Sequence, residues 1–170
     1  VYSTYHICWG AQAGLYYHYG IPKYMLSKKV FGIYPHTSLD VTHHLMRGLD
    51  DIFYVPQSRH TEIRMEDIAK VKDLQIISYS EMSGVHIVSD MDCRNFFVTG
   101  HSEYDRDTLA KEYFRYKEKG LDIDMPYNYF PNDDINLVPK VTWKSTANIL
   151  INNWLNYFVY QKTPYDLNTL

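Results

Sequence analysis

The cysteine at position 8 has the sequence surroundings of a catalytic nucleophile. Residues 1–7 (VYSTYHI) are largely β-branched or aromatic and predict a strand, and residues 9–19 predict a helix that ends at Gly20. Cys8 would then lie in the tight turn between them, the geometry of a nucleophile elbow, where the first free N–H groups of the helix favour the thiolate. The alternative is a buried cysteine that packs as a small apolar residue. The position at a strand–helix junction favours the nucleophile.

A general base for this thiol is offered by His101. Residues 94–99 (RNFFVT) predict a second strand that Gly100 ends, and the sequence continues His-Ser-Glu. Residues two apart on extended backbone project to one side, so His101 and Glu103 both face Cys8 if the two strands lie near each other. The imidazole would then take the thiol proton, and the carboxylate would hold the imidazole tautomer. The alternative is a surface His-x-Glu in a loop, because the motif alone is weak.

The remaining elements must position these side chains. Apolar runs at 74–79 and 84–89, separated by a polar turn, predict an antiparallel hairpin. A bulge is predicted at Gly32, a loop at 35–40 and a long proline-containing loop at 121–141. Further strands are predicted at 28–34 and 51–55, and helices at 61–72, 105–119 and 145–160. The last helix has a wide apolar face that suits core packing or a dimer contact.

The bulk composition restricts the class of protein. The 170 residues suffice for one domain with a substantial core. The net charge is -3 and no basic stripe is present, so nucleic acid is not expected as a partner. No apolar run reaches the roughly 18 residues that span a membrane, and no signal peptide opens the chain, so no membrane association is expected.

The cysteines and histidines do not predict a disulfide or a metal site. Cys8 and Cys93 are the only cysteines, which suits a reducing cytoplasm, and Cys93 is expected to be structural. His43, His44 and His60 lack the spacing and the further partners that a zinc site needs. These histidines are expected to be structural, and no metal is predicted.

Longer blocks of the sequence resemble a known family. The segment CWGAQAG (8–14) resembles the Cys-x-Gly-x-Gln elbow of class I glutamine amidotransferase-like domains, which pair it with a downstream His-x-Glu. Larger blocks resemble homoserine O-acyltransferases: ICWGAQAGLYYHYGIPK (7–23), RGLDDIFYVPQSRH (47–60), FVTGHSEYDRDTLAKEYF (97–114), PYNYFPNDD (126–134) and NNWLNYFVYQKTPYDL (152–167). One departure is Ser102, where the family pattern has proline.

The resemblance implies a fold and a reaction. The expected fold is an α/β domain with a mixed, mostly parallel sheet flanked by helices, formed by residues 1–170 as the C-terminal part of a longer enzyme. The expected reaction is transfer of an acetyl or succinyl group from acyl-coenzyme A, a co-substrate, to the hydroxyl of L-homoserine in cytoplasmic methionine biosynthesis, without a bound cofactor. The resemblance of residues 7–15 (ICWGAQAGL) favours acetyl over succinyl as the transferred group. A homodimer is compatible with the resemblance.

The resemblance also assigns roles to six residues. It implies catalytic roles for Cys8, His101 and Glu103, and substrate contacts for Lys29, Ser58 and Arg115. Backbone N–H groups near Trp9 would stabilise the oxyanion, with a second donor upstream of Val1. Without the resemblance, the three substrate contacts would be an exposed lysine, a loop serine and a helix arginine paired with Glu112 or Asp107.

Two other functions remain open. The first is a glutamine amidotransferase-like amide hydrolase, because the same three catalytic residues cleave amides. The second is a binding or regulatory module that has kept the fold without the activity. The presence of Cys8, His101 and Glu103 together argues against this second alternative, since a lapsed site loses such residues freely.

Overall fold

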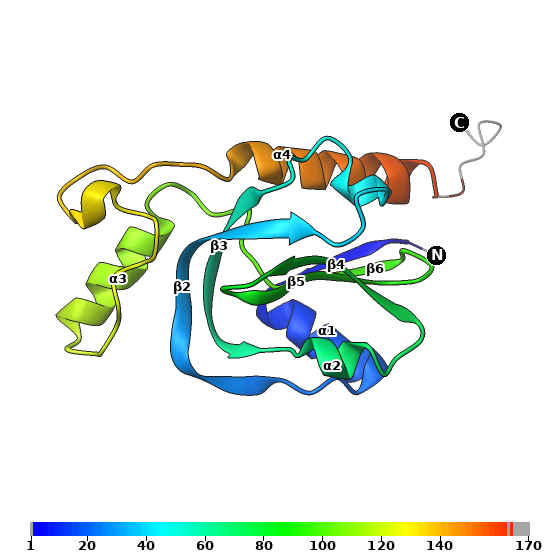
Figure 1. Cartoon of the computed structure of the whole chain (residues 1–170), viewed down its shortest axis with the longest axis horizontal. Helices are drawn as coiled ribbons and strands as arrows, with labels where there is room; N and C mark the ends of the chain where they lie inside the picture. The colour runs from blue at the N-terminus through cyan, green and yellow to red at the C-terminus, as the bar shows by residue number, and fades with distance from the viewer. Residues whose placement is uncertain (1, 163, 165–170) are drawn as a thin grey trace.

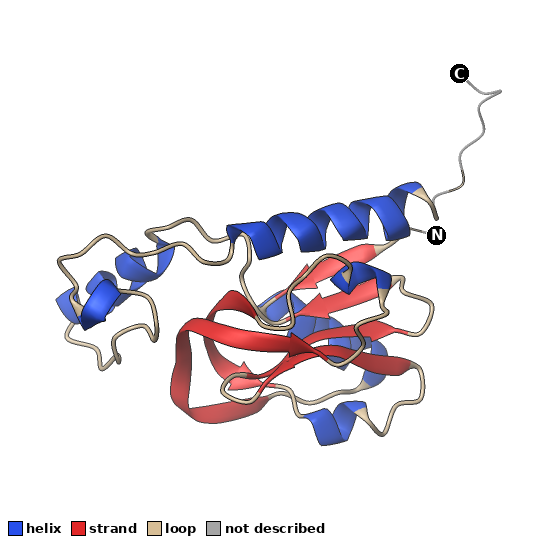
Figure 2. Cartoon of the chain, turned by 45° about the horizontal axis from the view of Figure 1, so that its top comes forward, coloured by secondary structure: helices blue, strands red, loops and turns tan. Residues whose placement is uncertain are grey.

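The computed structural model describes residues 2–162 and 164, and these form a six-stranded sheet with helices on both faces (Figures 1 and 2). In Figure 1, α1 and α2 lie below the sheet and α4 lies above it, while α3 stands beyond the curled β2–β3 hairpin at one end. The spatial order of the strands is β1-β6-β5-β4-β2-β3. The strands are β1 (Thr4–Ile7), β2 (Tyr24–Ser38), β3 (Phe53–Glu62), β4 (Leu74–Ser80), β5 (Gly84–Asp90) and β6 (Asn95–Val98). The α-helices are α1 (Trp9–Tyr19), α2 (Met65–Ile68), α3 (Thr108–Glu118) and α4 (Lys144–Asn153).

The α/β fold with a mixed sheet between helices is confirmed, but the strand pairing corrects the prediction that the sheet is mostly parallel. Within the described residues only β1 and β6 run parallel, and the other four neighbouring pairs are antiparallel. The reason is that short turns join β4 to β5 and β5 to β6, whereas a parallel pair needs a crossover connection of a dozen or more residues. The predicted hairpin of 74–79 and 84–89 is confirmed as β4 and β5.

The hairpin of β2 and β3 is much longer than its sequence pattern predicts. Residues 35–38, predicted to be a loop, belong to β2, and β3 continues past Pro56 to Glu62. Pairing across the hairpin explains the difference, because Pro35 and Pro56 are accommodated opposite Tyr54 and Ile33. Only Met65–Ile68 of the helix predicted at 61–72 is helical, since residues 61 and 62 pair with β2.

Gly32 on β2 allows the long loop 121–143 to lie directly against the strand. Its φ is 141°, and a Cβ atom there would lie 2.3 Å from the backbone nitrogen of Tyr127. Tyr127 donates to the Phe31 carbonyl (3.0 Å) and accepts from the Ile33 N–H (2.8 Å). The predicted bulge at Gly32 is wrong, because the register shift of this hairpin lies between Met25 and Val30. The glycine instead permits a close backbone approach.

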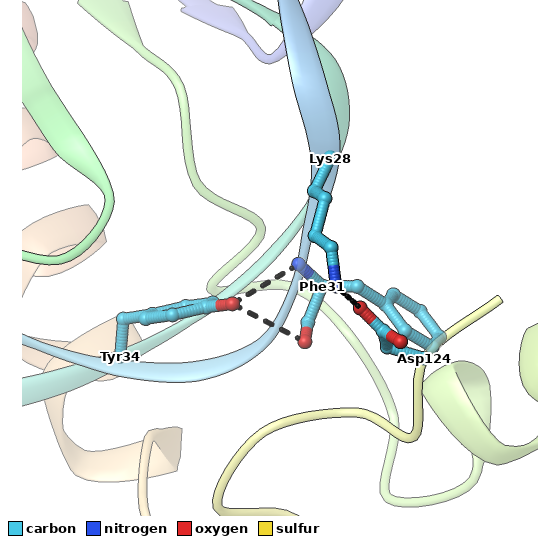
Figure 3. A network of polar contacts seen from close by, with 4 residues as sticks. All are labelled: Lys28, Phe31, Tyr34 and Asp124. Atoms are coloured by element: carbon cyan, nitrogen blue, oxygen red, sulfur yellow. Dashed lines mark hydrogen bonds and ion pairs between the residues drawn. The ribbon is translucent and has the colours of Figure 1, made fainter.

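Two further contacts hold this part of β2 (Figure 3). The Lys28 ammonium pairs with the Asp124 carboxylate at 3.3 Å and so links the strand to the loop. The Tyr34 hydroxyl accepts from the Phe31 N–H at 3.2 Å and lies 3.4 Å from the Phe31 carbonyl.

We expect Gly32→Ala to lower the free energy of unfolding by about 2–4 kcal/mol, because the methyl group clashes with backbone at a φ that L-residues rarely adopt. The matched control is Gly120→Ala, which has a φ of 65° but nothing within 4 Å of the new methyl. This control should lose only about 1 kcal/mol. Denaturant unfolding of both variants measures the difference, and equal losses would contradict the close-approach argument.

The core consists of three clusters of buried side chains. Two clusters lie on opposite faces of the sheet, one of them under α4 and the other under α1. The third joins β2 to α3 and to the loop 121–143, and comprises Phe31, Ile33, Leu109, Ile123, Tyr129, Phe130 and Trp143. We refer to this third cluster as the α3 core.

The last helix has the predicted extent but changes its winding. Residues Trp154–Tyr160 continue α4 as π-helical turns. Leu150 and Phe158 are buried in the sheet core, and Trp154 and Tyr157 pack against it, so much of the predicted apolar face serves core packing. Among the described residues, no helix has the length and apolar character needed to cross a membrane.

Candidate active site

Cys8 occupies a strained turn between β1 and α1. Its φ is 50°, an unusual value for a residue with a side chain, and its N–H donates to the Val98 carbonyl of β6 at 2.7 Å. The helix begins at Trp9, so the N–H groups of its first turn have no acceptor within the helix. The predicted helix and its end at Gly20 are confirmed, with Gly20 in the left-handed conformation. The turn therefore has the geometry of an elbow that presents a side chain next to free N–H donors.

The helix can approach the sheet closely because of Gly14. A Cβ atom at this position would lie 2.8 Å from the ring of Phe97 on β6. Since β6 is the parallel neighbour of β1, with Ile7 beside Val98, the ends of both strands meet at one edge of the sheet. The segment that follows β6 is thereby brought to the elbow.

This segment carries His101 and Glu103, and the predicted pair is present. His101 Nδ1 lies 2.6 Å from Glu103 Oε1. The backbone N–H of His101 donates to the Pro56 carbonyl at 2.8 Å and holds the segment, and the imidazole ring stacks on Tyr104 with centroids 4.2 Å apart. These contacts fix the imidazole plane and leave Nε2 as the nitrogen that is not bonded to Glu103.

The electrostatics of His101 favour its protonated form. Burial lowers its pKa, but the interactions with Cys8 and with the Glu103 carboxylate outweigh burial and raise the pKa from 6.5 to about 9. An imidazolium next to a thiol is the arrangement that favours a thiolate. Cys8, His101 and Glu103 therefore lie together as a nucleophile, a proton carrier and an orienting carboxylate would.

Lys29 and Ser58 also lie near each other, because both side chains contact Glu112. The Lys29 ammonium pairs with Glu112, and the two side chains are only 10% and 16% exposed. Ser58 Oγ donates to the other oxygen of Glu112 at 2.8 Å. Lys29 is thus not an exposed lysine, and Ser58 belongs to β3 and not to a loop. Glu112 was not predicted as a site residue, although its spacing of three from Arg115 places both on one side of α3.

Arg115 is exposed on α3 and makes no ion pair with any described residue. Its alternative partners are engaged elsewhere, since Glu112 pairs with Lys29 and Asp107 pairs with Lys111 at 2.5 Å. Arg115 lines a cavity of about 450 Å³ together with Ser58, Tyr104, Thr108, Lys111 and Glu112. Because Tyr104 also stacks on His101, this cavity adjoins the residues around Cys8.

His43 and His44 contact residues outside this site. His43 Nδ1 accepts from the Leu45 N–H at 3.1 Å, and His44 packs against the ring of Tyr157. Cys93 Sγ lies 3.6 Å from His43 Nε2. In the part of the chain that the structure describes, no three His, Cys, Asp or Glu side chains are arranged to hold a metal ion.

Comparison with known proteins adds three findings. The family model for homoserine O-succinyltransferase matches residues 1–165. A protein of Clostridium beijerinckii named homoserine O-acetyltransferase is 62% identical over 170 residues, and one of Petrotoga mobilis with the same name is 58% identical over 170 residues. The alignments cover 100% of this chain but 56% and 55% of the two relatives, so the chain spans little more than half of their length.

Solved structures with the same fold are more distant in sequence. A glutamine amidotransferase of Thermotoga maritima superposes with a TM-score of 0.64 at 17% identity, over 92% of this chain and 62% of that one. A glutamine amidotransferase of Methylobacillus flagellatus gives a TM-score of 0.61 at 11% identity, over 95% of this chain and 65% of that one. At these identities the likeness concerns the fold alone.

Proposed function

The chain belongs to the homoserine O-succinyltransferase family, and on this basis we propose that it transfers an acyl group from acyl-coenzyme A to the hydroxyl of L-homoserine. The observation that supports the proposal most directly is the position of Tyr104 between His101 and the cavity. Its ring stacks on His101, and its side chain also lines the cavity that contains Arg115 and Glu112. A small amino acid in that cavity would lie beside the proton carrier.

The first half-reaction acylates Cys8. The thiolate attacks the thioester carbonyl, the carbon–sulfur bond to coenzyme A breaks, and the imidazolium of His101 protonates the departing thiolate. The free N–H of Trp9, in the first turn of α1, supports the oxyanion. Glu103 keeps Nδ1 protonated, so that Nε2 is the nitrogen that moves the proton.

The second half-reaction uses the neutral imidazole left by the first. His101 takes the proton of the homoserine hydroxyl while the oxygen attacks the acyl-sulfur carbonyl, and the Cys8 thiolate is released beside the imidazolium. The guanidinium of Arg115 holds the substrate carboxylate through two parallel hydrogen bonds. Glu112 and Ser58 receive the substrate ammonium, and Lys29 positions Glu112 and offsets its charge.

We assign acetyl-coenzyme A as the donor and cytoplasmic methionine biosynthesis as the setting. The relatives from Clostridium beijerinckii and Petrotoga mobilis, which match the whole chain, are named homoserine O-acetyltransferase, and these names support acetyl over succinyl. The proposed machinery consists of side chains and backbone N–H groups and requires no bound cofactor. A homodimer stays a prediction.

Mass spectrometry of the intact protein tests the function. Incubation with acetyl-coenzyme A alone should add one acetyl mass on Cys8 and release coenzyme A, and homoserine should then remove that mass as O-acetylhomoserine. Succinyl-coenzyme A serves as the competing donor. Release of coenzyme A only when both substrates are present would contradict the covalent step. Ammonia release from glutamine without acyl transfer would instead favour the amide-hydrolase alternative.

We expect Arg115→Lys to weaken the use of homoserine by about 1–3 kcal/mol in kcat/KM, because lysine keeps the charge but loses the bidentate fork. Acylation of Cys8 by the donor should change little. Arg106→Lys is the matched control, since Arg106 lies outside the cavity and donates to the Pro139 carbonyl. Single-turnover rates of acylation and deacylation measure this difference. An equal decrease in both rates would show that Arg115 contacts the donor or has a structural role.

A further inference from the structure

The first turns of α1 carry an exposed aromatic face next to Cys8. Trp9 and Tyr16 are 68% and 67% exposed, although the burial of large aromatic side chains is favourable. They lie seven positions apart, with Gln12 and Ala13 between them, and this spacing puts all four residues on one face of the helix. The aromatic face therefore starts at the residue that directly follows the proposed nucleophile.

This face lines a groove on the surface of the protein. Pro22 and Lys23, in the segment between α1 and β2, complete the lining, and the volume of the groove is about 430 Å³. Its length along the helix from Trp9 to Tyr16 is about 10 Å, since each residue of an α-helix adds about 1.5 Å. A concave, mostly apolar site of this size is typical of small-molecule binding. We refer to the space lined by Trp9, Gln12, Ala13, Tyr16, Pro22 and Lys23 as the α1 groove.

Gln12 and Lys23 differ in how their polar groups are satisfied. Both ends of the buried Gln12 side chain bond to Thr61: Nε2 donates to the Thr61 carbonyl at 3.3 Å, and Oε1 accepts from Thr61 Oγ1 at 2.6 Å. Lys23 is exposed and makes no ion pair with any described residue, and its ammonium lies 5.8 Å from the centre of the Trp9 ring. The α1 groove therefore presents aromatic surface together with one uncompensated positive charge.

The α1 groove and the cavity that contains Arg115 approach the catalytic residues through different side chains. The cavity adjoins His101 through the ring of Tyr104. The α1 groove begins at Trp9, whose Cα atom is about 3.8 Å from that of Cys8 across a trans peptide bond. The two spaces have no lining residue in common. A molecule in the α1 groove would therefore leave the cavity open to homoserine.

An acyl-coenzyme A donor has chemical groups that match the α1 groove. Its thioester lies at the end of a flexible pantetheine arm, which continues into phosphate groups and a purine ring. With the thioester carbon at the Cys8 sulfur, the arm has to run over the surface next to the elbow, where the α1 groove starts. Purine rings stack on aromatic side chains, and phosphate groups pair with lysine ammonium groups. The aromatic face and the charge of Lys23 thus complement the purine ring and the phosphates.

We propose that the α1 groove binds the coenzyme A part of the donor. The pantetheine arm and the purine ring contact Trp9 and Tyr16, and the ammonium of Lys23 pairs with a phosphate group. This site rests on the proposed function, because that function names acyl-coenzyme A as the donor. It adds the place where the donor binds, and it gives a role to exposed side chains of α1 that the two half-reactions do not use.

Isothermal titration calorimetry of the purified protein with coenzyme A tests the aromatic face. Trp9→Ala and Tyr16→Ala should each raise the Kd about tenfold or more, because each variant removes a stacking surface. Both variants are expected to fold, since the two side chains are largely exposed. The matched control is Tyr17→Ala, because Tyr17 is 83% exposed on the same helix but does not line the α1 groove. Its Kd should stay within about twofold of the parent value.

The same titration with Lys23→Met tests the charge. This variant should raise the Kd about threefold to tenfold at low ionic strength, and added salt should reduce the difference from the parent, because salt screens an exposed ion pair. Lys72→Met is the matched control. Lys72 is also exposed and makes no ion pair with any described residue, but it lies outside the α1 groove.

The outcomes separate this site from the proposed function. If the parent binds coenzyme A and the three groove variants bind it equally well, the site is overturned and the proposed function stands. If the parent binds coenzyme A and the groove variants weaken that binding but no acyl group is transferred, the site stands and the proposed function fails. If the parent does not bind coenzyme A, both are overturned.

Two further results bear on the site. Should Trp9→Ala disturb the elbow, Tyr16→Ala decides alone, because Tyr16 lies about two helical turns from Cys8. Sedimentation of the variants detects the other occupant of an exposed apolar groove, a second copy of this chain. A change in oligomeric state with an unchanged Kd for coenzyme A would overturn the proposal.

Discussion

Replacing Cys8 by serine is expected to reduce acyl transfer from acetyl-coenzyme A to homoserine by about 10⁴-fold or more. Serine keeps the shape of the side chain in the elbow, but its hydroxyl does not ionise next to an imidazole as a thiol does. The imidazolium of His101 then has no thiolate beside it. Acylation, measured as coenzyme A release in a single turnover, should be lost before any effect of homoserine is seen.

The second cysteine supplies a matched control. Cys93 also has a positive φ, of 54°, and is also half-buried, but it lies beside His43 in the turn between β5 and β6. Burial raises the pKa of the Cys93 thiol. Cys93→Ser should therefore retain nearly full activity. Activity in Cys8→Ser at the level of Cys93→Ser would show that Cys8 is not the acyl carrier.

Replacing Glu103 by glutamine is expected to lower turnover on the order of 10²- to 10³-fold. Glutamine keeps the size of the side chain but can donate to Nδ1, which allows the wrong tautomer of His101. Deacylation should suffer more than acylation, because an alcohol cannot lose its proton unaided whereas a thiol ionises easily. Rates of both half-reactions in Glu103→Gln measure this. A larger effect on acylation, or a loss below tenfold in both, would contradict the orienting role.

The same variant changes the titration of His101. The Glu103 carboxylate favours the imidazolium, so its removal lowers the His101 pKa from about 9 towards the ordinary 6.5. An NMR titration of the His101 ring should therefore show a midpoint at least one pH unit below that of the parent. The sign follows because loss of a negative neighbour destabilises the charged form. An unchanged midpoint would mean that Cys8 alone maintains the raised pKa.

The local part of the site was predictable from the sequence because it depends on neighbouring residues. The change from β-branched residues to a helical pattern at Cys8, and the spacing of His101 and Glu103, place each side chain at the end of its own strand. That these strands are neighbours is confirmed by the β1–β6 pairing. From the sequence alone, the proximity of these two strands was an assumption and not a prediction.

The remaining part depends on pairing between distant segments. The ends of β2 and β3 follow from cross-strand register and not from the prolines that interrupt the pattern. Lys29 and Glu112 lie 83 positions apart, and no local pattern joins them. The resemblance to a family named Lys29, Ser58 and Arg115, but it did not show Glu112 between the first two.

The α3 core is expected to unfold locally at a lower free energy than the sheet that carries Cys8 and His101. Phe31 and Ile33 connect this cluster to the sheet, and Trp143 anchors it near the site by donating to the Tyr104 carbonyl at 2.9 Å. Proteins open locally in contiguous units whose free energies differ, and a small peripheral core opens more readily than a central sheet. Local unfolding of the α3 core would move Glu112 and Arg115 out of the cavity, while the backbone around Cys8 and His101 would stay folded. A substitution that weakens the packing of Trp143 is therefore expected to weaken the use of homoserine, because it lowers the fraction of molecules in which the α3 core is folded.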